Sequence, residues 1–275
     1  MNGISSPAAT QSPRRQRLTI YYAQRCFLLL GSSFTLDRHH SPYRRLAATL
    51  LISRQQPFDL ETDAGSLLGI EAALIAPKVL RQRIAAVGSD IAILDIPMAC
   101  PAYRRMAGQL SSQPQRGYPR AQFQNLFPLL QKAADGLLSG GDFHALQADA
   151  AQIIADGAAQ TDALDSRVAQ AMRMIDALPL DQVRLALLAQ QLELSSSRLR
   201  HLFIAETGST VSHYARWVAV WRAVHLWAPH RTWTDIAHES GFHDLAHLDH
   251  AFVEVFGLTP STVFDPEHVR LCRVD

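Results

Sequence analysis

Apolar positions follow two different periods along this chain. As far as about residue 97, short apolar runs alternate with clusters of turn residues, a pattern typical of β-strands. From about residue 120 onward, apolar residues recur every three or four positions, as on one face of a helix. The expected strands are 18–23, 26–30, 47–53, 58–61, 67–76 and 90–96. The pattern therefore predicts an α+β two-domain fold, with a β-sandwich or barrel followed by an all-helical part.

Two helices are expected between these parts. A Ser-Gly-Gly break at 139–141 separates them, and Asp142 is placed to cap the second. Their apolar stripe consists of Phe123, Leu126, Phe127, Leu130, Ala133, Ala134, Leu137 and Leu138 in the first helix, and Phe143, Leu146, Ala150, Ile153, Ile154 and Ala158 in the second. This helical hairpin, 118–160, could pair across two subunits or pack only within its own domain, because both arrangements bury the same stripe.

The most informative pattern is a repeat in the last third of the chain. Residues 185–203, L-A-L-L-A-Q-Q-L-E-L-S-S-S-R-L-R-H-L-F, place two apolar-periodic helices around a three-residue break, which predicts a helix–turn–helix. Residues 236–252 repeat this arrangement. The matched pairs are Ala189 and Ala237, Leu199 and Leu248, Phe203 and Phe252, Gly208 and Gly257, and Thr210 and Thr259. Two units with the same glycine and threonine caps are far more specific than one.

Residues 166–264 resemble the C-terminal DNA-binding module of the AraC/XylS family of bacterial transcription regulators. The most specific part is G-F-H-D-L-A-H-L-D-H-A-F-V-E-V-F-G-L-T-P-S, 241–261, which follows the family signature nearly position by position. The resemblance implies two helix–turn–helix units joined by one long helix. It also implies double-stranded DNA and RNA polymerase as partners, and activation more often than repression.

The N-terminal part is similar to the cupin-type domain that many members of this family carry, with A-L-I-A-P-K-V-L, 73–80, as the phrase in common. The resulting division of the chain is a disordered tail 1–17, a cupin-like sensing domain 18–117, the helical hairpin 118–160 with possible dimerisation, a linker 161–166 and the DNA-binding domain 167–265. The resemblance implies an unknown small-molecule effector and a possible homodimer.

The candidate DNA-binding residues come from the same resemblance. Ser197, Arg200 and His201 occupy positions where relatives touch bases, and an arginine can bind guanine O6 and N7 with two hydrogen bonds. Arg216 and Arg222 match positions where arginine is common, and could bind either phosphate or an acid within the fold. The full set is Ser196, Ser197, Arg198, Arg200, His201, Arg216, Arg222, Ala246, His247 and His250. An ordinary solvated helix face is the alternative for the first recognition helix.

The two helix–turn–helix units differ strongly in net charge. The formal net charge of the chain is +1. Residues 182–231 contain six arginines and two glutamates, a balance of +4, whereas residues 232–269 contain seven acids and no lysine or arginine, a balance of −7. Because phosphate neutralisation dominates DNA affinity, the first unit, with recognition helix 196–207, should carry most of it.

Other functions are less well supported. His39 and His40 are adjacent rather than spaced like cupin metal ligands, and His243, His247 and His250 already have places in the family motif, so we expect no metal, no cofactor and no enzyme activity. A cupin-type enzyme and a ligand-binding or interaction protein with weakened DNA binding stay as alternatives. No apolar run is long enough for a membrane span, and the odd number of cysteines fits a reducing cytoplasm.

Overall fold

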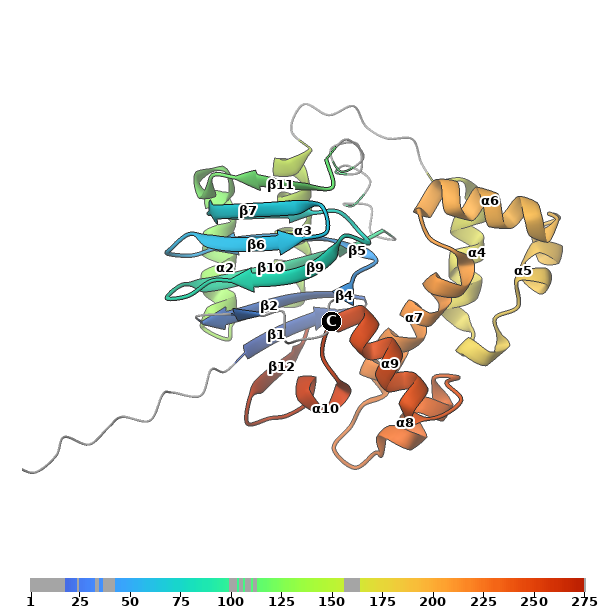
Figure 1. Ribbon diagram of the computed structural model, residues 1–275. Helices are drawn as coiled ribbons and strands as arrows, with labels where there is room; N and C mark the ends of the chain where they lie inside the picture. Colours follow the sequence, from blue (N-terminus) through green and yellow to red (C-terminus); the bar gives the residue numbers. More distant parts are fainter. Residues whose placement is uncertain are drawn as a thin grey trace, which may run out of the picture.

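The computed structural model describes residues 18–23, 25–32, 35–36, 43–98, 103, 106, 110, 113–155 and 164–274. Figure 1 shows a strand-rich body and a helical body, which confirms the expected α+β two-domain fold. The predicted tail 1–17, the first half of the predicted linker 161–166, and His39 with His40 lie outside the described residues. No helix in the described part of the chain is long and apolar enough to cross a bilayer.

The strands form two sheets. The first has the order β11-β8-β5-β10-β2-β1-β12, and every neighbouring pair is antiparallel except β1 and β12. Its strands are β1 (Leu18–Ala23), β2 (Cys26–Ser32), β5 (Ala47–Ser53), β8 (Ala72–Ile75), β10 (Asp90–Pro97), β11 (Gln115–Tyr118) and β12 (Val269–Arg273). The second has the order β3-β9-β6-β7, with β4 also paired to β9. Its strands are β3 (Thr35–Leu36), β4 (Tyr43–Arg44), β6 (Phe58–Thr62), β7 (Gly65–Ile70) and β9 (Leu80–Ala85).

One expected strand, 67–76, is in fact two strands in different sheets. β7 belongs to the second sheet and β8 to the first, and Glu71 lies between them. The carboxylate of Glu71 accepts a hydrogen bond from the backbone N–H of Arg120 at 3.0 Å and forms an ion pair with its guanidinium. Apolar residues continue through this corner, from the partly buried Leu67 and Ile70 of β7 into the fully buried β8, so composition alone did not mark the break.

The helical hairpin covers the first sheet from within the same chain. It comprises η1 (Arg120–Leu126), α2 (Phe127–Ala134) and α3 (Gly140–Ile154). Phe123, Leu126, Ala133, Phe143 and Ala150 are fully buried, and η1 contacts β5. The central strands are consequently buried on both faces, between these helices and the second sheet. The apolar stripe is therefore used for packing inside the subunit, which is one of the two arrangements considered from sequence.

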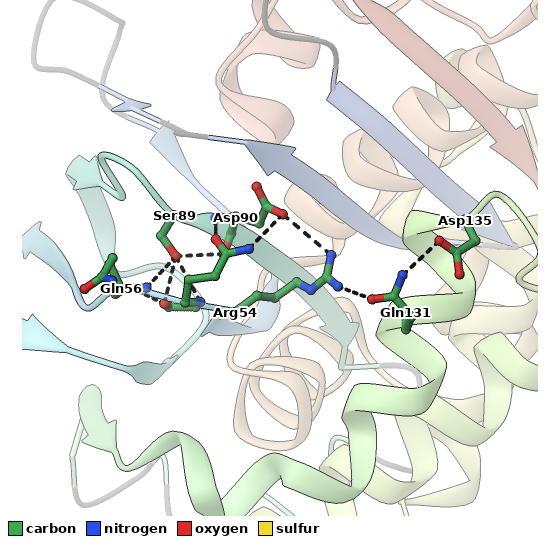
Figure 2. Close-up of polar contacts among 8 residues, drawn as sticks. Arg54, Gln56, Ser89, Asp90, Gln131 and Asp135 are labelled. Carbon is green, nitrogen blue, oxygen red and sulfur yellow. Dashed lines mark hydrogen bonds and ion pairs between the residues drawn. The ribbon is translucent and has the colours of Figure 1, made fainter.

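A polar network fixes α2 to one end of the sheet (Figure 2). Arg54 follows β5, donates a hydrogen bond to Gln131 on α2, and lies 3.7 Å from the carboxylate of Asp90 at the start of β10. Next to it, the buried hydroxyl of Ser89 accepts a hydrogen bond from the backbone N–H of Gln56 at 3.0 Å. These bonds satisfy backbone groups in the turn after β5 and hold helix, turn and strand together.

The helical body contains two helix–turn–helix units joined by one long helix. Its helices are α4 (Ser166–Ala177), η2 (Leu180–Gln182), α5 (Leu185–Gln191), α6 (Ser196–Thr207), α7 (Val211–Leu226), α8 (Trp233–Glu239), α9 (Leu245–Phe256) and α10 (Pro260–Val263). Trp217 and Trp221 on the long helix α7 are 4% and 3% exposed. They are core residues, as their helical spacing predicted, and do not form a surface for stacking bases.

The two bodies pack closely against each other. The guanidinium of Arg25, between β1 and β2, binds both carboxylate oxygens of Asp176 on α4 and lies 5.6 Å from the centre of the Trp217 ring. Farther along the interface, Phe27 contacts Trp221 and Phe256, with ring centres 6.4 and 5.9 Å apart. Apolar and charge-assisted contacts together define one relative position of the strand-rich body and the helical body.

Strand β12 was not expected from sequence. It follows the helical domain, yet it pairs in parallel with β1 at the edge of the first sheet, from Leu18 opposite Val269 to Tyr22 opposite Arg273. In Figure 1 it runs beside β1, below the rest of the sheet. Strand β12 therefore belongs to the strand-rich body and not to the helical body that precedes it.

Candidate DNA-binding surface

The first unit is built by α5, a tight turn and α6. Glu193 in the turn has φ 55°, a left-handed conformation that costs a side-chain-bearing residue about 1 kcal/mol. Ser195 caps α6 by accepting a hydrogen bond from the backbone N–H of Arg198 at 3.2 Å. At the other end, Gly208 adopts φ 63° and ends the helix. Both ends of the first recognition helix are therefore fixed by local sequence.

The second unit has the same construction. Asp244 caps α9 through the backbone N–H of His247 at 2.7 Å, and Gly257 ends it with φ 76°. Gly241 takes the turn position of Glu193, with φ 84°. A Cβ atom at Gly241 would overlap the backbone of Leu180 and lie 2.8 Å from the Asp181 nitrogen, so the site requires glycine for space as well as for conformation.

The predicted reading face of α6 is open to solvent. Leu199 and Phe203 are fully buried on the inner side of the helix. On the outer side, Ser197, Arg198, Arg200 and His201 are exposed and Ser196 is half-buried. Among the described residues, the guanidinium groups of Arg198 and Arg200 form no ion pair. Their charges are therefore available to phosphates or bases.

His201 has a defined orientation on this face. Its Nδ1 lies 2.8 Å from the carbonyl oxygen of Ser197, one helical turn earlier. A carbonyl can only accept, so Nδ1 must carry the proton and donate it. The neutral ring then presents Nε2 as an acceptor, which suits the amino groups of adenine or cytosine in the major groove.

Arg216 and Arg222 have partners inside the fold. Arg216 Nη1 lies 3.1 Å from Glu254 on α9, and the same carboxylate approaches His213 at 3.4 Å. Burial lowers the pKa of His213, outweighing the opposing effect of Glu254, so this histidine carries little charge at neutral pH. From the sequence, these arginines could bind either phosphate or an acid within the fold. In the structure, Arg216 binds an acid within the fold, Glu254.

Arg222 is held by main-chain groups. Its Nη2 donates to the carbonyl oxygens of Asp176 and Leu178, both at 2.9 Å. These carbonyls end α4, where the last turn of a helix has unpaired acceptors and a partial negative charge. The partner of Arg222 is therefore a helix end, which sequence reasoning did not consider.

The outer face of α9 is polar but not basic. Ala246, His247 and His250 are exposed, as predicted for residues that contact DNA. Asp249 lies half-buried beside them, and burial raises the pKa of its carboxyl group. No arginine or lysine occurs on this helix. The two recognition helices thus offer very different electrostatic surfaces to a phosphate backbone.

Comparison with known proteins agrees with this construction. The profile of a helix-turn-helix domain matches residues 188–265. Among solved structures, the apo form of a ToxT variant from Vibrio cholerae superposes with a TM-score of 0.56 at 10% identity, covering 87% of this chain and 96% of that chain. A second ToxT structure gives 0.55 at 11% identity, again over 87% and 96%. ToxT with a bound unsaturated fatty acid gives 0.52 at 12% identity, over 85% and 93%. A search of curated protein sequences gave no match.

Residues 188–265 are therefore a helix-turn-helix domain of the AraC type, a class of domain that binds DNA. The chain as a whole shares the two-domain fold of the ToxT structures.

Proposed function

We propose that this protein binds duplex DNA sequence-specifically, with α6 in the major groove and Ser197, Arg200 and His201 reading bases. The observation that carries the proposal is the exposed face of α6, where two unpaired arginines flank an oriented histidine on a helix capped at both ends. Arg200 has the donor geometry for guanine, and His201 the acceptor for adenine or cytosine. Arg198 suits a neighbouring phosphate.

The second unit contributes less in this proposal. Its recognition helix has no cation, and Glu254 on the same helix already binds Arg216. His247 and His250 can donate or accept single hydrogen bonds but carry no permanent charge. We therefore propose an asymmetric site, with one well-defined half-site for α6 and one weakly defined half-site for α9.

An effector that carries a carboxylate is supported by an excess of buried positive charge. Arg45 and Arg81 are 5% and 1% exposed, and Asp95 is the acid they share. Arg45 Nη1 lies 2.9 Å from Asp95, whereas Arg81 reaches it through the hydroxyl of Thr49, at 2.6 and 2.7 Å. Burial, followed by the charge of Arg45, lowers the pKa of Arg81 to about 10. The Nε atoms of both arginines have no hydrogen-bond partner within the described residues, and an anion would supply one.

Arg45 also borders an apolar cavity between the two domains. Phe27, Trp221 and Phe256 line this cavity, whose volume is about 40 Å³. Such a space holds little more than a water molecule, so an effector would have to separate the domains locally. Structures of ToxT contain an unsaturated fatty acid and a naphthyl-substituted butenoic acid, which are both carboxylic acids. We propose a ligand of the same chemical class here.

Three further expectations stay predictions drawn from the family resemblance. They are activation rather than repression, contact with RNA polymerase, and a homodimer. Most of the hairpin's apolar stripe is buried inside the subunit, but its member Leu137, between α2 and α3, is exposed. Any dimer through the hairpin must therefore use the outer side around Leu137.

Selection from a random-sequence duplex library by the purified full chain tests the proposed function. We expect enrichment of a site with one sharply defined half and one weakly defined half. Two equally sharp halves would contradict the asymmetry. Absence of enrichment by folded protein, both alone and with a fatty acid added, would contradict sequence-specific binding and favour an interaction protein.

A further inference from the structure

The C-terminal strand β12 ties the end of the DNA-binding domain to the edge of the sensing domain. Besides the five paired positions, the N–H of Leu18 donates to the His268 carbonyl at 2.9 Å, and the N–H of Val274 donates to the Tyr22 carbonyl at 3.0 Å. Without β12, β1 would be an open edge of the first sheet. The helical domain is thus attached at both of its ends, by the linker before α4 and by β12 after α10.

A short and well-packed connection joins β12 to the second recognition helix. Phe264, which follows α10, lies against the rings of Trp233 on α8 and Phe252 on α9, at 5.0 and 6.4 Å. The turn from Asp265 is closed by hydrogen bonds from the N–H groups of His268 and Val269 to the Asp265 carbonyl. Only residues 265–268 connect Phe264 to Val269, the first residue of β12. Displacement of the strand must therefore also displace the end of the second helix–turn–helix unit.

Contacts of β12 reach three parts of the molecule. Leu271 borders the apolar cavity between the domains, together with Ile20 and Trp221. The guanidinium of Arg270 lies beside Gly136 at the end of α2, where a Cβ atom would be 3.0 Å from it. The strand therefore contacts the edge of the first sheet, the helical layer at the end of α2, and the cavity between the domains.

Strand β12 is bound to its sheet less strongly than the central strands are. It has five residues, it pairs on one side only, and the pairing is parallel. Val269 and Val274 are buried, Leu271 and Cys272 are half-buried, and Arg270 and Arg273 are exposed. Little apolar area must be uncovered to detach it, in contrast to the fully buried strands β5 and β10, so it can open without unfolding the sheet.

We propose that residues 264–274 form a releasable C-terminal strap, which when closed holds the second helix–turn–helix unit against the sensing domain. Release leaves the helical domain attached through the linker before α4 and through the side-chain contacts at Arg25 and Phe27. The contacts of Tyr43 with Gly257 and of Lys78 with Gly208 also remain. A molecule that enters the cavity beside Leu271 would favour release, because the cavity cannot accommodate it while the strap is closed. This inference concerns the coupling of the domains, and its tests require no DNA.

Hydrogen exchange of the full-length protein tests whether the strap opens. We expect the amides of residues 269–274 to exchange at least about tenfold faster than those of β5 and β10. The Leu18 amide should exchange at the same rate as the strap, because its hydrogen-bond acceptor is the His268 carbonyl. Exchange of all these amides at a single rate, set by global unfolding, would show that β12 is a permanent strand and would overturn the proposal.

Distance measurement between spin labels tests whether the strap holds the domain. Labels at Ala64→Cys on the β6–β7 turn and Thr234→Cys on α8 occupy exposed sites, in a background with the native cysteines replaced. A chain ending at Val274 serves as the matched control for a chain ending at His268. We expect a narrow distance distribution in the control and a broad one in the shortened chain, both with folded circular dichroism spectra.

A narrow distribution at the same distance in both chains would show that the interface alone fixes the domain, and would overturn the proposal. A shortened chain that fails to fold would leave the exchange measurement to decide, since that measurement uses the intact protein. A control chain that is dimeric and becomes monomeric when shortened to His268 would assign β12 to exchange between two copies and would contradict an intramolecular strap.

Discussion

The ring of Tyr43 lies against Gly257, the residue that ends the second recognition helix, so closely that a Cβ atom there would be 2.5 Å from Tyr43 Cδ1. A sensing-domain residue thus occupies the space next to the C-terminal cap of α9. The first recognition helix has a related contact, since Lys78 donates a hydrogen bond to the carbonyl of Gly208. The sensing domain therefore touches the end of each recognition helix, and changes in that domain can reach both.

Substitution of Gly257 tests this relationship. Gly257→Ala should destabilise the full chain by about 1 kcal/mol for the left-handed backbone and by about 1–3 kcal/mol more for overlap with Tyr43. Gly208→Ala is the matched control, because Gly208 has a similar φ of 63° but nothing within 4 Å of a Cβ. Denaturant unfolding of both variants measures the difference. Equal losses would show that Tyr43 can move aside freely.

Neutralising acids on α9 should strengthen DNA binding. Asp249→Asn with Glu254→Gln removes two negative charges near the phosphates and frees Arg216, which Glu254 binds at 3.1 Å. We expect affinity to rise by about threefold to tenfold and the salt dependence to become steeper. Asp149→Asn, on the exposed side of α3 in the sensing domain, is the control for charge alone. Unchanged affinity and slope in the double variant would mean that α9 stays away from DNA.

The buried charge cluster predicts opposite outcomes for two substitutions. Asp95→Asn removes the acid shared by Arg45 and Arg81 and should destabilise the protein by about 3–5 kcal/mol. Arg81→Met removes the surplus charge and should cost much less, or stabilise. Thermal unfolding measures the stability of both variants. In a separate measurement, addition of a long-chain carboxylate should raise the Tm of the natural protein and should raise the Tm of Arg45→Met less. A larger loss for Arg81→Met than for Asp95→Asn would contradict the assigned charge surplus.

The start of the helical domain should be sensitive to acid. Asp165 caps α4, and its hydrogen bonds to Arg167 lower the pKa of its carboxyl group to about 2. Because the pKa is lower in the folded protein, the stabilisation is complete above the ordinary value of about 4 and is lost as pH falls toward 2. Asp165→Asn should therefore reduce stability at pH 6 and have little effect at pH 2. An equal loss at both values would exclude an ionised cap as the cause.

Local patterns predicted the recognition helices well. The expected helix 196–207 coincides with α6, and the glycine that ends it, Gly208, has its counterpart Gly257 in the repeat. Cap chemistry and apolar period act within a few residues, so they can be read from the chain itself. The side chains proposed to read DNA were exposed for the same reason, since the buried stripe of Leu199 and Phe203 fixes which face of α6 points outward.

Long-range partners could not be predicted in this way. β12 has the short sequence V-R-L-C-R, and its pairing partner β1 lies at the opposite end of the chain. Strand pairing depends on the surface that the fold offers, and a five-residue segment has little preference of its own. Arg222 illustrates the same limit, because an arginine that caps α4 and one that binds phosphate look alike in the sequence.

Comparison of Arg200→Ala with Arg173→Ala on the selected DNA site tests the central claim most directly. Both arginines are exposed in the helical domain, but Arg173 lies on α4, away from the proposed reading face. We expect Arg200→Ala to weaken binding by about 1–3 kcal/mol and to lose discrimination at one base pair, whereas Arg173→Ala should change affinity little and specificity not at all. Equal losses for the two variants, with specificity retained, would show that α6 contributes charge alone and would contradict base reading by this helix.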